Sequence, residues 1–154
     1  DMEARENVAL ANTLGGMVET FSSCTSEHSL EHALSAYYPK LPHGAGLIMI
    51  SLPYYKFFQG KVAPERYAKM AEAMGEDVHS LPEDKRADAF ISALEKLQKA
   101  CGVDNLKMSD YGVKRDEMDK LATTAKETMG GLFDLDVYRL THEDTVSILQ
   151  EAYK

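Results

Sequence analysis

The chain has little of several features that define whole classes of protein. Among its 154 residues only Cys24 and Cys101 are cysteines. A disulfide scaffold needs a denser pattern, so we expect two free thiols and a reducing cytoplasm. The longest apolar stretch, residues 45–55, contains Pro53 and is too short to span a bilayer, which takes about 20 apolar residues.

Positive charge is also scarce. Lys and Arg number 17 against 25 Asp and Glu, which gives a formal net charge of −8. Nucleic-acid phosphates and anionic membrane surfaces are bound by clustered cations, so the sequence argues against both as partners. It also contains no glycine-rich dinucleotide loop, Walker loop or serine nucleophile elbow. If a nucleotide cofactor is used, its phosphates are bound elsewhere.

Helical periodicity runs along nearly the whole sequence. Apolar residues recur at intervals of three and four, and no segment alternates as a half-buried strand does. We expect all-α structure: a bundle-like domain of about six to seven helices spanning residues 1–154. The predicted helices cover residues 3–21, 26–37, 43–58, 64–75 and 115–129. Another runs from the cap at 80–83 to 102, and a last one from about 141 through 152.

Three details of these helices can be checked. Gly15 and Gly16 interrupt the first helix, and we expect another element to approach closely there. The segment 43–58 is almost all apolar and should be deeply buried. Capping boxes are predicted at 80–83 and 141–144, each starting a helix.

Three of the five histidines fall within 16 residues. His28 and His32 are four apart, so on a helix their imidazoles project from one face. His43 follows a short loop that can fold back toward that face. Pro42 before it fixes the chain direction, and Gly44 after it permits close approach. Neutral imidazole is a common ligand of zinc, iron and copper, so this window predicts part of a metal or redox site.

Plainer roles remain open for these residues. Histidine pairs at this spacing occur on many helices without metal, and His43 could instead cap the apolar helix. Glu27 and Glu31 could fix imidazole tautomers, although an exposed acidic pair is the commoner arrangement. Cys24 is a candidate soft ligand, but a small buried residue is the commoner role.

The other histidines and the tyrosines receive simpler interpretations. His79 and His142 sit beside helix starts in polar stretches, so we expect solvated or capping side chains. Four tyrosines gather near the histidine window, where core or interdomain contacts are the default and a pocket wall is the sharper alternative. They are Tyr37, Tyr38, Tyr54 and Tyr55.

The histidine window and both ends of the chain resemble the iron-containing (group III) alcohol dehydrogenases. The likeness rests on residues 4–11, on His28-x-x-x-His32-Ala33-Leu34 with Tyr38, on Pro42-His43-Gly44 and on residues 140–149. Ser35 departs from the family, in which a glycine is common at this position. The resemblance spans essentially the whole chain. It implies that residues 1–154 are the C-terminal helical metal and substrate domain, without the N-terminal Rossmann-like nucleotide domain.

The same resemblance implies roles for the histidines. His28 and His43 match two metal ligands, whereas His32 matches a catalytic residue beside the metal, near the nicotinamide and the substrate. The family's other two ligands, an Asp and a His, lie on an earlier helix and have no counterpart in this chain. The implied cofactors are Fe²⁺ or Zn²⁺ and NAD or NADP, with the nucleotide bound mainly by the other domain.

The implied activity is that of an alcohol dehydrogenase, and the two expected free thiols indicate a cytoplasmic location. Such an enzyme interconverts a primary or secondary alcohol and an aldehyde or ketone by hydride transfer with NAD(P), and we expect these 154 residues alone to be inactive. The expected partners are a small alcohol or aldehyde and the nucleotide domain of the same protein, with homo-oligomerisation left open. The alternative is a stand-alone helical module for metal binding or protein interaction.

Overall fold

The fold is entirely helical. The computed structural model describes residues 1–154 apart from the side chain of Asp84, and none of the described residues lies in a β-strand. The all-α prediction is therefore confirmed. The α-helices are α1 (Met2–Phe21), α2 (Ser26–Tyr37), α3 (His43–Phe58), α4 (Pro64–Ala73), α5 (Glu83–Ala100), α6 (Met118–Met129) and α7 (His142–Ala152). Short 3₁₀ helices are η1 (Met108–Tyr111), η2 (Arg115–Glu117) and η3 (Gly130–Leu135).

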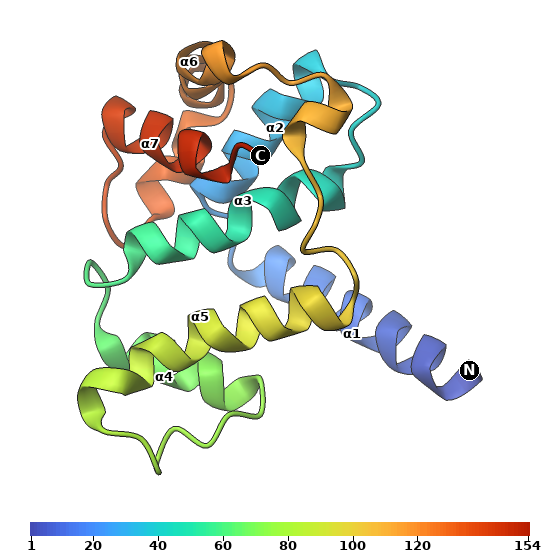
Figure 1. Cartoon of the computed structure of the whole chain (residues 1–154), viewed down its shortest axis with the longest axis vertical. Helices are drawn as coiled ribbons and strands as arrows, with labels where there is room; N and C mark the ends of the chain where they lie inside the picture. The colour runs from blue at the N-terminus through green and yellow to red at the C-terminus, as the bar shows by residue number, and fades with distance from the viewer.

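Four helices form the main bundle. Helix α2 packs against α3 and α6, and α7 packs against the same two helices. Helices α4 and α5 form a hairpin at one end, joined to the bundle through contacts between α5 and α3 (Figure 1). The most deeply buried large side chains come from α2, α3, η1, α6, η3 and α7, so the core lies among these elements. They include Leu30, Leu34, Ile50, Leu121, Phe133, Ile148 and Leu149.

Helix α1 stands apart from this bundle. It runs away from the other helices toward the N-terminus (Figure 1), and none of its residues is buried. The close approach predicted at Gly15 and Gly16 is wrong, since no atom of another element lies within 4 Å of a Cβ placed at either residue. The apolar residues Val8, Leu14 and Val18 are more than half exposed.

The predicted burial of residues 43–58 and the predicted capping boxes are each confirmed in part. Helix α3 buries Met49, Ile50 and Tyr54 at its centre, but several of its other side chains are only half-buried. The capping box at α7 is present, with Thr141 and Asp144 bonding to each other's backbone N–H. At α5 the helix follows Pro82 without a side-chain cap.

Helix α6 also starts later than predicted. Residues 115–117 form the 3₁₀ turn η2, and α-helical geometry begins at Met118. The Glu117 carboxylate accepts hydrogen bonds from the backbone N–H of Lys114 and from the Tyr38 hydroxyl. None of the described helices is long and apolar enough to cross a membrane.

Candidate metal centre

The hairpin of α2 and α3 brings the three histidines of the window together. Backbone hydrogen bonds from Tyr38 N–H to the Leu34 carbonyl and from Leu41 N–H to the Tyr38 carbonyl, both 2.8 Å, close the turn. Leu41 is 4% exposed and anchors the turn in the core. Pro42 is extended, with φ −64° and ψ 135°, and His43 follows as the first residue of α3.

The spacing of the rings suits a shared metal ion. The ring centroid of His43 lies 5.5 Å from that of His28 and 5.4 Å from that of His32, and the His28 and His32 centroids are 6.3 Å apart. Two imidazoles on one tetrahedral ion, with metal–nitrogen distances of about 2.0–2.1 Å, have ring centres roughly 5 Å apart. The His28–His43 and His32–His43 pairs fit this spacing. The ligand atoms that all lie within 4.8 Å of one another belong to Glu31, His32 and His43 and do not include those of His28.

The surroundings favour neutral imidazole at His28. Burial lowers the pKa of His28 below its usual value, and the neighbouring His43 and His32 lower it further. A metal ion binds the neutral form of the ring, so these effects favour ligation. His32 is exposed on the same side of α2, and its Nδ1 contacts the Met129 sulfur.

A buried carboxylate lies directly behind the histidines. Glu31 has no exposed surface, and its carboxylate contacts Nδ1 of His43 and accepts a 2.5 Å hydrogen bond from Ser35 Oγ. The ligand atoms of Glu31, His32 and His43 all lie within 4.8 Å of one another. Of the two open interpretations of Glu31, the exposed acidic pair is therefore wrong.

Glu27 is also buried, but it faces a different cluster. Burial raises the pKa of Glu27 to about 7, partly opposed by a hydrogen bond from the Tyr55 hydroxyl. Tyr54 is 4% exposed and belongs to the core, and Tyr55 packs against it, as the default interpretation of these tyrosines expects. Both also line a small cavity of about 190 Å³. Tyr37, in contrast, is 43% exposed.

The remaining sequence candidates lie outside the site. His79 and His142 are exposed and contact carboxylates, with Nε2–oxygen distances of 3.5 Å to Glu72 and 2.7 Å to Asp119. Cys24 is half-buried, and burial together with Glu19 raises the pKa of its thiol. This environment disfavours the thiolate, which is the form that binds metal.

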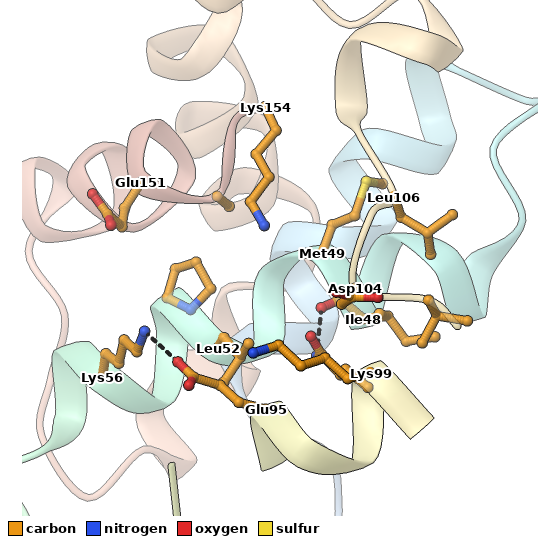
Figure 2. Close-up of a pocket in the computed structure, with 14 residues that line it drawn as sticks. Ile48, Met49, Leu52, Lys56, Glu95, Lys99, Asp104, Leu106, Glu151 and Lys154 are labelled. Carbon is orange, nitrogen blue, oxygen red and sulfur yellow. Dashed lines mark hydrogen bonds and ion pairs between the residues drawn. The ribbon is translucent and has the colours of Figure 1, made fainter. Parts of the chain in front are cut away.

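A second cavity occupies another part of the bundle. It has a volume of about 290 Å³ and is lined by residues of α3, α5, α7 and the segment after α5. Figure 2 shows Lys56 paired with Glu95 at its edge, with Nζ and Oε1 2.8 Å apart. Because Lys56, Lys99 and Lys154 are balanced by Glu95, Asp104 and Glu151, the lining has no excess charge of either sign.

The sequence profile of a known family matches almost the whole chain. Residues 1–153 match the "Fe-containing alcohol dehydrogenase family, C-terminal". The chain belongs to this family. The resemblance inferred from the histidine window is therefore confirmed.

Individual relatives agree with this assignment. The chain is 30% identical over 125 residues to 1,3-propanediol dehydrogenase of Klebsiella pneumoniae, which covers 81% of this chain and 32% of the relative. It is 32% identical over 127 residues to NAD-dependent methanol dehydrogenase of Bacillus methanolicus, covering 82% and 32% of the two chains. The chain thus spans about a third of the length of these relatives.

The structure of an archaeal alcohol dehydrogenase extends the likeness to the fold. An enzyme from a halo-thermophilic archaeon of a Red Sea brine pool superposes with a TM-score of 0.88 at 28% identity. The match covers 99% of this chain and 38% of that enzyme. The helical arrangement described above is therefore that of a family member.

Proposed function

We propose that this chain is the metal- and substrate-binding part of an iron-containing alcohol dehydrogenase. In this proposal His28 and His43 are metal ligands and His32 is the catalytic residue beside the metal. The observation that carries it is the convergence of three imidazoles, with centroids 5.4–6.3 Å apart, on one hairpin. Membership of the family supports the same roles.

The three histidines have different roles in such a site. A divalent Fe²⁺ or Zn²⁺ ion supplies Lewis acidity, which favours loss of a substrate hydroxyl proton or polarises a substrate carbonyl. His28 of α2 and His43 at the start of α3 would hold the ion between the two helices of the hairpin. His32 is exposed next to them and can carry the proton toward solvent, because an imidazole exchanges protons near neutral pH.

The rest of the reaction depends on parts outside these residues. We infer that NAD or NADP accepts the hydride and is bound mainly by an N-terminal Rossmann-like domain. Two further ligands, an Asp and a His, would complete the metal site from a helix that precedes these residues in the full-length protein. The relatives named for 1,3-propanediol and methanol support a small primary alcohol as the substrate. The two free cysteines are compatible with a cytoplasmic location.

The test is a metal titration followed at the histidines. Zn²⁺ is added to the chain while NMR records the ring signals of all five histidines, in the wild type and in a His28→Ala/His43→Ala variant. We expect weak binding that shifts the three window histidines together and is lost in the double variant. A His79→Ala variant is the matched control, since this exposed ring lies outside the cluster.

Two other results would change the assignment. Equal effects at His79, His142 and the window would contradict a metal site at α2 and α3. Tight binding by these residues alone, lost in the double variant, would favour the stand-alone metal-binding module. Robust NAD-dependent alcohol oxidation by the isolated chain would contradict a half-site that needs ligands from elsewhere.

A further inference from the structure

We infer that Glu31 is a positioning residue that holds His43 with its proton on Nδ1 and its Nε2 free to bind metal. This inference rests on the proposed role of His43 as a ligand. It assigns a function to a glutamate whose side chain is fully buried. Ser35 and Gly46 contribute to the same arrangement around the Glu31 carboxylate.

The contacts of Glu31 assign its role. One carboxylate oxygen accepts from His43 Nδ1, and the other accepts from Ser35 Oγ at 2.5 Å. A ring that donates from Nδ1 carries its lone pair on Nε2. Ligating histidines commonly donate their second ring nitrogen to a carboxylate in this way, which fixes both the tautomer and the ring orientation.

Burial makes the glutamate a rigid anchor. The side chain of Glu31 has no exposed surface, whereas 49% of the His43 side chain is exposed. A buried charge is retained only when it is hydrogen-bonded, and here both oxygens have partners. The first turn of α3 lies against this carboxylate, and the positive end of the helix dipole stabilises negative charge there.

Gly46 provides the space in which this carboxylate sits. A Cβ atom at residue 46 would lie 2.7 Å from Cγ of Glu31 and 2.8 Å from its Oε1. Any side chain at this position would therefore displace the carboxylate from His43 or push α3 away from α2. Glu31 therefore explains the glycine at position 46. It does not explain Gly44, where an added Cβ would meet no atom within 4 Å.

A direct ligand role for Glu31 is the competing interpretation. Its oxygen lies in the same 4.8 Å cluster as the His32 and His43 nitrogens. Ligation would require the carboxylate to leave His43 Nδ1 or to share an oxygen between the ring and the ion. The two interpretations differ in metal-free protein, because only positioning predicts a fixed His43 tautomer before any ion is added.

The first measurement is the His43 tautomer in the metal-free chain, by ¹⁵N NMR at about pH 8.5, where imidazoles are neutral. We expect the Nδ1–H form to dominate in the wild type and in Glu31→Gln, whose amide oxygen still accepts a hydrogen bond. Glu31→Ala should shift the population toward Nε2–H. Glu27→Gln is the matched control, because it removes the other buried glutamate of α2 without touching His43.

The second measurement is Zn²⁺ affinity of the same variants. Loss of a partner that orients a ligating histidine typically costs roughly 10–100-fold in affinity. We expect Glu31→Ala to weaken binding within this range and Glu31→Gln to weaken it less. If Glu31→Ala does not fold, Ser35→Ala and Glu31→Gln still report the tautomer.

The outcomes separate this inference from the proposed function. An unchanged tautomer in Glu31→Ala would overturn the positioning role, even if His28 and His43 bind metal. A wild-type tautomer in Glu31→Gln with metal binding abolished would overturn it in favour of direct ligation. A shifted tautomer in Glu31→Ala with unchanged metal binding would support the positioning of His43 but contradict its role as a ligand.

Discussion

Helices α1 and α2 have similar sequence patterns and opposite environments. Both show apolar residues at helical spacing, and both form helices as predicted. None of the 20 residues of α1 is buried, whereas seven of the 12 residues of α2 are. Periodicity therefore predicts the helix and the face that needs a partner, but it does not say whether the partner is present.

The largest expected difference concerns one leucine from each helix. Leu30 of α2 is fully buried, so Leu30→Ala should lower the free energy of unfolding by about 2–5 kcal/mol. Leu14 of α1 is 51% exposed, and Leu14→Ala should change it by less than about 0.5 kcal/mol. Urea denaturation followed by circular dichroism compares the two. Equal losses would mean that α1 is packed in solution.

A pH-dependent difference should follow from Glu27. Burial disfavours the charged form and raises the pKa of Glu27 from its ordinary value of 4.5 to about 7 in the folded chain. Deprotonation is then easier in the unfolded chain, so stability is lost as pH rises from about 4.5 to about 7 and stays lower above that. We expect Glu27→Gln to be more stable than wild type at pH 8 by roughly 2–3 kcal/mol, and to lose most of this advantage near pH 4.5.

The control for this prediction comes from α1. Glu6 is exposed, and Glu6→Gln should show no comparable pH-dependent gain. Denaturant midpoints measured at intervals from pH 4.5 to pH 8 give both curves. A Glu27→Gln advantage that is constant across this range would argue against titration of the buried carboxyl group.

Glycine substitutions should give the smallest effects, with opposite signs in the two regions. Gly46→Ala places Cβ against Glu31 and should destabilise the chain by about 1–3 kcal/mol. Gly15→Ala meets no neighbouring atom and should favour α1 by up to about 1 kcal/mol, seen as increased helicity. A destabilising Gly15→Ala would reveal a close neighbour of α1 in solution.

Much of the candidate site could be predicted from the sequence. The spacing of His28 and His32 and the short loop before His43 suffice to place three rings on one side of a hairpin. The burial of the two glutamates also agrees with their spacing, because Glu27, Leu30, Glu31 and Leu34 follow the i, i+3, i+4, i+7 pattern of a buried stripe. The expectation of an exposed acidic pair rests on the polarity of the two glutamate side chains, and it neglects their position on this stripe.

The partners of these residues could not be predicted in the same way. The fit of the Glu31 carboxylate over Gly46 depends on how closely α3 crosses α2, which is a property of packing rather than of either helix. The start of α5 is similar, since Ser80 bonds to Asp77 rather than capping the helix. Which hydrogen bonds such a turn residue makes depends on how tertiary contacts position the turn.

The hairpin that holds the histidines combines contacts between residues close in the sequence with contacts between residues far apart in it. The three histidines, Glu31 and Gly46 all lie within residues 28–46, and Glu31 and His43 are only 12 positions apart. The supports of α2 are distant: Ser29 Oγ donates to the Met129 carbonyl, 100 residues on, and Ser26 N–H donates to Asp136, 110 residues on. Local contacts form before distant ones, and synthesis proceeds from the N-terminus. All three histidines are therefore present in the nascent chain before Met129 and Asp136, which hold α2 in place, are synthesised.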